Sequence, residues 1–219
     1  MRNLREFMKT LLNSLWLLLL MLSGASISSA ADASSLKPPP GAKVAVVVFE
    51  DLQCSDSARA FPIVWQAANA HHVPVVSYSF PLPMHNWSFD ATVWFRFFDA
   101  KSEKLGNQFR DYIYSNQTRI TRANLQQFVQ RFGDQNKIPI PSANDPDGKL
   151  TEKVKADYAL GQQIGLVHAP TVFVVGQGGV SAPFVEVVNR EELNQTIADM
   201  LRKAEPEAPV KPSAKKKSR

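Results

Sequence analysis

Cysteine is almost absent from this sequence. Cys54 is the single cysteine among 219 residues, so the chain cannot close an internal disulfide. This excludes the class of small secreted domains that disulfides hold together. A hydrophobic content of 44% is instead enough for one well-packed core.

A hydrophobic run long enough for a comfortable membrane span is also missing. The apolar stretch at residues 11–22 is short and interrupted, whereas a spanning helix needs about 20 apolar residues. Basic residues precede this stretch, and small residues follow it up to Ala30. This order predicts a signal peptide at residues 1–30 and an exported protein, periplasmic or extracellular. If the signal is cleaved, no integral membrane span is expected; a retained signal anchor is the alternative.

The central part of the chain lacks net charge. The total is +5, of which residues 1–9 contribute +2 and residues 205–219 contribute +3. The excess of positive charge therefore lies at the ends rather than on a face that follows phosphates, and no nucleic-acid partner is predicted. Residues 205–219 are rich in Pro, Ala, Glu and Lys, a composition typical of a disordered basic tail.

What the sequence does contain is a valine-rich strand pattern that runs into a turn carrying the cysteine. Residues 44–49 are apolar, as in a strand covered on both faces. Residues 58–70 have the periodicity of an amphipathic helix. A cysteine at a helix N-terminus faces free backbone N–H groups and the positive end of the helix dipole, so the position of Cys54 favours the thiolate.

The remaining patterns predict further strands and helices around this segment. Residues 31–42 are rich in Pro and Ser and predict an extended linker. The predicted strands are at residues 73–80, 171–175 and 180–188, with a glycine-rich hairpin turn at 176–179. The predicted helices are at residues 88–102, 105–115, 121–133, 150–164 and 190–203.

Residues 49–62 resemble the active-site segment of bacterial DsbA-like proteins of the thioredoxin superfamily. The family pattern is an aromatic residue, an acid, a Gln-Cys pair that opens a Cys-x-x-Cys motif, and then a helix. This chain has Ser57 in place of the second cysteine. It also has Ser55 in place of the proline that often follows the first cysteine.

Residues 165–176 resemble a second family segment, in which a cis-proline precedes the third strand and lies beside the active-site cysteine. Pro170 is the expected cis-proline. A cis bond before proline turns the preceding backbone outward, where its polar groups can pair with an incoming chain. Ala169 stands where the family often has threonine, so a side-chain hydroxyl contact is missing.

Together the two segments imply an α/β fold of the thioredoxin-like, DsbA-like type. In this fold a helical insertion interrupts the core between its second and third strands. The resemblance implies one domain at residues 43–204, with the insertion at about residues 88–165.

The single thiol limits the chemistry that the resemblance implies. Ser57 cannot attack sulfur, so a mixed disulfide at Cys54 must wait for an external thiol, and dithiol oxidation is excluded. The resemblance then implies an exported thiol–disulfide oxidoreductase or isomerase that acts through Cys54, with Ser57 and Pro170 completing the site. The expected partners are client proteins bearing thiols or disulfides and an external reductant. No bound cofactor or metal is expected, and glutathione or another small thiol is the expected low-molecular-weight exchange partner.

Neighbouring residues are expected to modulate the thiol. Asp51 and Asp56 are like charges that oppose the thiolate, whereas a hydrogen bond from the Ser57 hydroxyl would favour it. His168, two positions before Pro170, would favour it too if it lies near Cys54 and is protonated; a surface histidine is the alternative. The thiol is therefore predicted to be less acidic than in strongly oxidising relatives.

Two other functions stay compatible with the same residues. One is a redox-inactive binding module that recognises extended peptides over the Pro170 loop. The other is a structural envelope protein whose cysteine makes an intermolecular disulfide. A cysteine–histidine hydrolase or a metal site using His85 or His168 has no supporting spacing.

Overall fold

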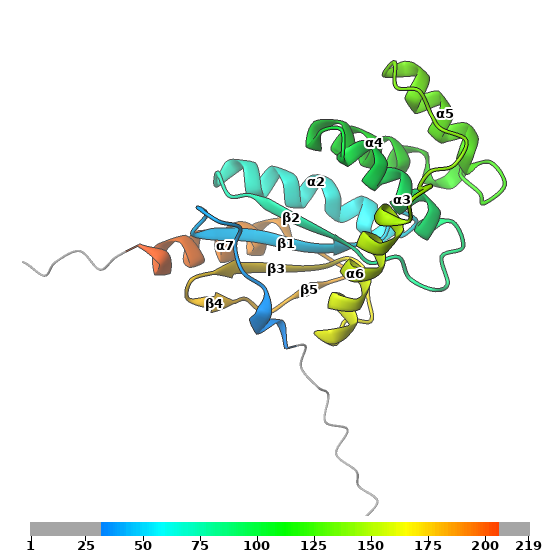
Figure 1. The fold of residues 1–219 in the computed structure, drawn as a ribbon. Coiled ribbons are helices and arrows are strands. Elements are labelled where there is room, and N and C mark those ends of the chain that lie inside the picture. The colour runs from blue at the N-terminus through cyan, green and yellow to red at the C-terminus, as the bar shows by residue number, and fades with distance from the viewer. Residues whose placement is uncertain (1–31, 206–219) are drawn as a thin grey trace, which may run out of the picture. The chain divides into compact units, whose positions relative to one another are not determined.

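The computed structural model describes residues 32–205 (Figure 1). The predicted signal peptide at residues 1–30 lies outside the described residues, as does all but the first residue of the predicted basic tail. No helix among the residues the structure describes combines the length and the apolar character that crossing a bilayer requires.

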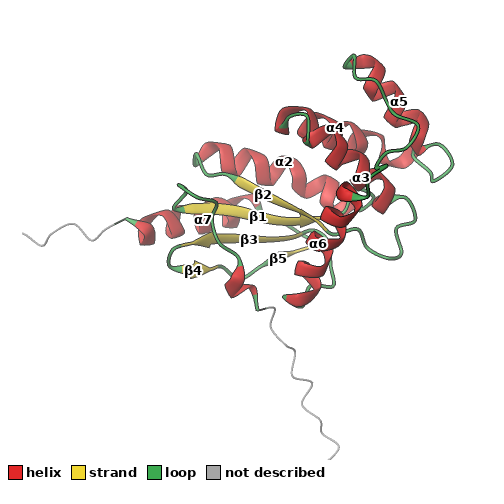
Figure 2. Ribbon diagram, in the orientation of Figure 1, coloured by secondary structure: helices red, strands yellow, loops and turns green. Residues whose placement is uncertain are grey.

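The described residues form a five-stranded mixed sheet with β1 (Val44–Glu50) in its interior (Figure 2). β1 pairs in parallel with β2 (Val75–Ser79) and antiparallel with β3 (Thr171–Gly176). The short strands β4 (Gly179–Val180) and β5 (Phe184–Val185) both pair antiparallel with β3. Every residue of β1 is buried, as the valine-rich run predicted for a strand covered on both faces.

The two faces of β1 belong to two different cores because side chains alternate along a strand. Val44, Val46 and Val48 pack with α2 (Ser55–Ala70) and α7 (Arg190–Ala204). The alternate residues Ala45, Val47 and Phe49 pack in a second core with Phe80, Ile164 and Phe173. This arrangement fixes where β1 ends, and therefore where the cysteine turn lies.

The helical insertion has an aromatic core of its own. The insertion consists of α3 (Ser88–Asp99), α4 (Glu103–Asn116), η2 (Gln117–Arg119), α5 (Leu125–Gln135) and α6 (Lys149–Gln163). Its buried rings include Trp94, Phe98, Phe109, Phe128 and Phe132. The predicted α/β, thioredoxin-like fold with a helical insertion between the second and third core strands is confirmed.

Within the range predicted as a linker, residues 31–42, the described part begins with local structure. Residues Ala33–Ser35 form a short 3-10 helix, η1, whose N-cap is Asp32: its carboxylate accepts a hydrogen bond from the Ser34 N–H. Ala33 and Leu36 are buried with the residues of the second core. Burial of these two apolar side chains favours the ordered conformation of the segment.

Two predictions fail for local reasons. The strand predicted at residues 180–188 is divided into β4 and β5, and Pro183, which has no N–H to donate to a ladder, lies between them. Gly133 does not end its helix: α5 continues to Gln135, and a Cβ at Gly133 would lie only 2.5 Å from the Ile140 side chain. Gly133 therefore serves close packing.

Candidate active site

Cys54 occupies the N-cap position of α2, immediately after the turn that follows β1. The turn closes through a hydrogen bond from the Cys54 N–H to the Asp51 carbonyl, 3.1 Å long. The cysteine has extended backbone angles, and its side chain accepts no capping hydrogen bond from the first helical turn. Only 7% of the residue is exposed. The predicted strand–turn–helix placement of the thiol is confirmed.

The loop before β3 lies against the thiol. The peptide bond between Ala169 and Pro170 is cis, as the sequence predicted. The Cys54 thiol donates a hydrogen bond to the Ala169 carbonyl, with 3.1 Å between Sγ and the oxygen. The fold thereby joins two segments that lie 115 positions apart in the sequence. Since Ala169 has no hydroxyl, its contact with the thiol is made by the backbone alone.

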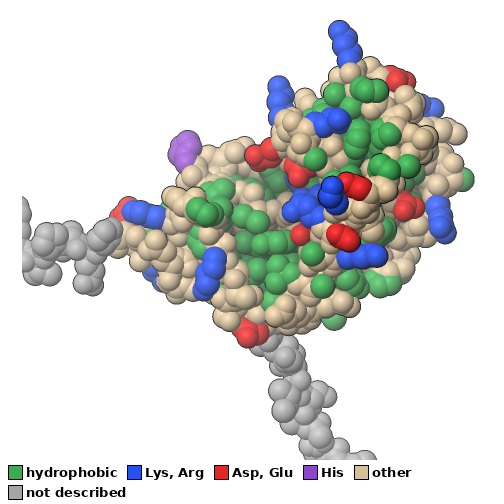
Figure 3. All heavy atoms as spheres, viewed as in Figure 1, with side chains coloured by type: hydrophobic (Ala, Val, Ile, Leu, Met, Phe, Trp, Pro, Cys, Tyr) green, Lys and Arg blue, Asp and Glu red, His purple; other side chains and the backbone are tan. Residues whose placement is uncertain are grey.

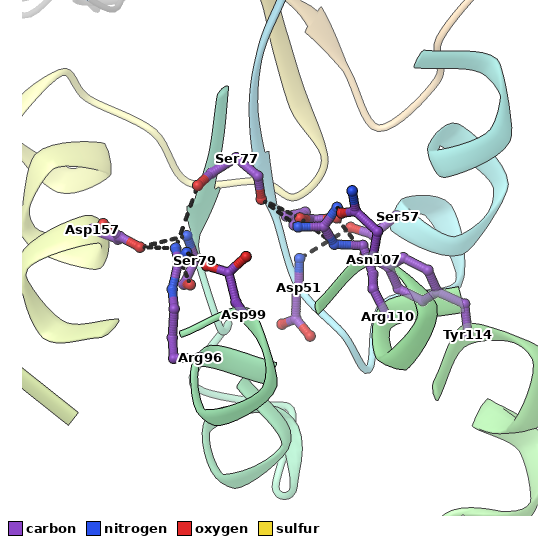
Figure 4. Close-up of polar contacts among 11 residues, drawn as sticks. Asp51, Ser57, Ser77, Ser79, Arg96, Asp99, Asn107, Arg110, Tyr114 and Asp157 are labelled. Atoms are coloured by element: carbon purple, nitrogen blue, oxygen red, sulfur yellow. Dashed lines mark hydrogen bonds and ion pairs between the residues drawn. The ribbon is translucent and has the colours of Figure 1, made fainter. Parts of the chain in front are cut away.

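Ser57 lies in the first turn of α2 and is among the groups that act on the thiol. Its hydroxyl oxygen accepts a hydrogen bond from the Asp51 N–H at 3.2 Å, and the residue is only 2% exposed. Figure 4 shows this contact between the turn and the helix. The Ser57 hydroxyl therefore ties the first turn of α2 to the backbone of the cysteine turn.

Burial raises the pKa of the Cys54 thiol above its ordinary value. The N–H and hydroxyl of Ser57 and the charge of Arg59 lower the pKa, and the negative charge of Asp51 raises it further. The bond to the Ala169 carbonyl acts in the same direction as burial, because only the protonated thiol can donate it. Burial therefore outweighs the groups at the helix N-terminus that favour the thiolate, so the pKa of Cys54 lies above, not below, that of an ordinary thiol.

A pH profile of alkylation tests this direction. We expect iodoacetamide to reach half its maximal rate with native Cys54 at a higher pH than with the same chain in denaturant, where the thiol is ordinary. The reason is that a raised pKa leaves less thiolate at neutral pH. If the alkylation rate of native Cys54 levelled off at a lower pH than that of the denatured chain, the raised pKa would be contradicted.

The other expected modulators lie in separate environments. Asp56 pairs with Arg59 one turn further along α2, so a cation accompanies its charge. His168 is half exposed, and its Nδ1 lies 3.0 Å from a carboxylate oxygen of Glu186. His168 therefore has an acid as its charged partner, and only its backbone neighbour Ala169 touches the thiol.

Asp51 is the centre of a hydrogen-bond cluster under the cysteine turn, and its side chain is fully buried. One oxygen, Oδ1, accepts from the Gln53 N–H at 2.7 Å and from the Ser88 hydroxyl. The other, Oδ2, accepts from the Leu82 N–H at 2.6 Å and lies 2.7 Å from Nδ1 of His85. Sequence reasoning placed Asp51 beside Cys54 but did not connect it with His85.

A buried ion pair beside the turn was not anticipated. Nε of Arg110 on α4 lies 3.0 Å from a carboxylate oxygen of Glu50, the last residue of β1. The guanidinium also donates to Ser77 and Asn107 (Figure 4). The Tyr114 hydroxyl donates to the other Glu50 oxygen. A charged residue at the end of an otherwise apolar strand was the available signal.

A second ion pair covers the outer edge of β2. Arg96 donates to the Ser77 carbonyl at 3.3 Å and to the Ser79 hydroxyl at 2.9 Å, and it pairs with Asp157. Asp157 accepts from the Ser79 N–H at 3.1 Å. The pair therefore satisfies backbone groups that an edge strand would otherwise leave open, and Figure 4 shows it beside Ser77.

One face of the described residues carries charged side chains of both signs (Figure 3). On the face shown in Figure 3, basic and acidic side chains lie intermingled, with hydrophobic side chains between them. That face offers no continuous surface of one sign that would follow a phosphate backbone.

Together, the strand order, the cysteine at the N-terminus of α2 and the cis-proline loop against it define a thioredoxin fold. The helical insertion makes it the DsbA-like variant. No protein-family model and no curated protein matches the chain.

Solved structures do match. Wolbachia pipientis alpha-DsbA1 has 13% sequence identity and a TM-score of 0.62, covering 77% of this chain and 93% of that one. A periplasmic thioredoxin-like protein from Salmonella enterica serovar Typhimurium has 12% identity and a TM-score of 0.59, covering 75% and 88%. The thiol-disulfide exchange protein alpha-DsbA2 from Wolbachia pipientis has 15% identity and a TM-score of 0.58, covering 75% and 85%. The DsbA-like fold is thereby established.

Proposed function

We propose that this protein is an exported thiol–disulfide oxidoreductase or isomerase that acts through Cys54 alone. The observation that carries the proposal is the thiol at the N-terminus of α2, 3.1 Å from the Ala169 carbonyl of the cis-proline loop. Similarity to a thiol-disulfide exchange protein supports the same class of chemistry. Ser57 restricts that chemistry to one thiol.

The proposed reaction has two exchange steps that balance without an oxidant. The Cys54 thiolate attacks one sulfur of a client disulfide, a Cys54–client mixed disulfide forms, and the client's other sulfur leaves as a thiolate. An external thiolate, such as that of glutathione or a second cysteine of the client, then attacks the client sulfur. Cys54 leaves as the thiolate and takes up a proton. One disulfide has been exchanged for another, with no net oxidation.

The raised pKa of Cys54 suits this role rather than that of an oxidant. A thiol of high pKa is a poor leaving group, so its mixed disulfides are slow to break, whereas its thiolate is strongly nucleophilic once formed. Because Ser57 cannot resolve the adduct, a captured client stays bound until another thiol arrives. These properties favour capture and reshuffling of disulfides.

Loss of the thiol provides the direct test. We expect Cys54→Ala to abolish both the mixed disulfide with a disulfide-bearing peptide, detected by mass spectrometry, and the reshuffling of a scrambled client in glutathione buffer. The matched control is Ser55→Ala, which changes an exposed residue of the same turn and keeps the thiol. Equal reshuffling by wild type and Cys54→Ala would overturn the proposal.

A second function is favoured by one observation, the 7% exposure of Cys54. A redox-inactive binding module of the same fold would keep the thiol protonated on the Ala169 carbonyl and would bind clients without turnover. In that case native Cys54 would resist alkylation and carry no adduct, while an unfolded client would still bind to Cys54→Ala. An obligate disulfide-linked dimer would instead favour the structural envelope protein.

Export is part of the proposal. It rests on the composition of residues 1–30 and agrees with the description of the Salmonella structure as periplasmic. In a bacterial host we expect the full chain to be found in the periplasmic or extracellular fraction, with a new N-terminus at Ala31 by Edman sequencing. An intact N-terminus in the membrane fraction would favour the signal-anchored form.

A further inference from the structure

His85 connects the solvent with the buried acid next to the thiol. Its side chain is 23% exposed, whereas Asp51, which it contacts, is fully buried. Three of the four groups around the Asp51 carboxylate donate to it and are not titratable near neutral pH: two backbone N–H groups and the Ser88 hydroxyl. The fourth group is an imidazole, and histidine is the side-chain type whose ordinary charge change falls near neutral pH.

Asp51 in turn acts on the thiol. The Cys54 N–H bonds the Asp51 carbonyl within the turn, and the negative charge of Asp51 opposes the Cys54 thiolate. A change in the net charge of the Asp51–His85 pair is therefore felt at the sulfur. The pair carries one negative charge when the imidazole is neutral and none when it is protonated.

The other charged groups around the turn are already matched with partners. On α2, Asp56 pairs with Arg59; on β1 and α4, Glu50 pairs with Arg110 and accepts from Tyr114. Next to the cis-proline loop, the side chain of His168 pairs with Glu186. His85 is thus distinguished by its direct contact with the acid of the cysteine turn.

We propose that His85 is a positioning residue that, by neutralising or exposing the charge of Asp51, makes the reactivity of the Cys54 thiol depend on pH across the range in which histidine titrates. Protonated His85 cancels the charge that opposes the thiolate, so the thiol ionises more readily on the acid side. As pH rises and His85 loses its proton, Asp51 opposes ionisation in full. The use of this dependence in exchange rests on the proposed function, whereas the thiol titration does not.

The direction in which His85 protonation changes thiol ionisation predicts a characteristic dependence of the alkylation rate on pH. For an isolated thiol below its pKa, the alkylation rate rises about tenfold per pH unit. In the wild type we expect a shallower rise through the histidine range and the full slope above it, because the two sites titrate as a coupled pair. In His85→Asn, whose amide can still donate to Asp51, we expect one uniform slope. On the acid side we expect the wild type to react about three to ten times faster than this variant.

His72→Asn is the matched control, since His72 is an exposed histidine at the end of α2 and its backbone angle φ of 55° is one that asparagine tolerates. We expect it to keep the shallow region. Ultraviolet thiolate absorbance against pH checks that the profile reports ionisation rather than access.

A measurement on the wild type alone guards against misfolding of His85→Asn. The pH of the shallow region should match the pH at which the His85 imidazole titrates by NMR. A uniform slope in the wild type, or a shallow region that persists in folded His85→Asn, would overturn the proposal. Failure to reshuffle clients, with the coupled profile intact, would reject the proposed function and leave the role of His85 supported.

Discussion

The Ser57→Cys variant is expected to form an internal disulfide with Cys54 and to release captured thiols on the order of a thousand times faster than the wild type. The residue is close enough for its N–H and hydroxyl to influence the thiol, and a second sulfur there would attack a mixed disulfide intramolecularly. Well-oriented groups in one molecule react as if present at concentrations of about 10⁵ M or more. This is far above any external thiol, so the gain should survive imperfect geometry.

The thiol count after mild oxidation and the lifetime of a glutathione adduct measure the change. Wild type should retain one reactive sulfur, and Ser57→Cys none. Ser55→Cys is the matched control: it adds a thiol to the same turn, at an exposed position directly adjacent to Cys54. Two free thiols in oxidised Ser57→Cys, or an unchanged adduct lifetime, would show that the turn does not hold position 57 against the sulfur. A loss of about 1 kcal/mol of stability is also expected, because sulfur accepts the Asp51 N–H poorly.

Arg110→Met is expected to lower the free energy of unfolding by about 3–5 kcal/mol, because it leaves the buried Glu50 carboxylate without its cation. The guanidinium is 2% exposed and lies 4.5 Å from the centre of the Phe95 ring and 4.6 Å from that of Trp65. Methionine fills part of that space but replaces none of the charge. Urea denaturation followed by circular dichroism measures the difference in the free energy of unfolding between the wild type and Arg110→Met.

A double variant separates charge from packing. In Glu50→Gln with Arg110→Met neither charge remains, so we expect it to be more stable than the sum of the two single losses implies. Arg131→Met is the control, since it removes an exposed arginine 5.4 Å from the Phe128 ring and should cost about 0–1 kcal/mol. Strict additivity, or an Arg110→Met loss as small as that of Arg131→Met, would contradict the role assigned to the buried pair.

Elements whose signals are local could be predicted from the amino-acid sequence. The valine run of β1, the helix after Cys54, the cis-proline at Pro170 and the helical insertion were all predictable from periodicity, turn chemistry and two short resemblances. The sequence alone likewise shows that there is no second cysteine and that Ser57 stands in its place. This absence limits the chemistry to one thiol however the chain folds.

The environment of that thiol, by contrast, depends on contacts between segments that are distant in the sequence. The carbonyl that accepts from Cys54 comes from 115 positions away, and the histidine that contacts Asp51 from 34 positions away. The dipole argument favoured an acidic thiol, but burial, which is a property of the packed chain, raises the pKa instead. Contacts between distant segments depend on how the helices pack on the sheet, and no local pattern specifies which side chains then meet.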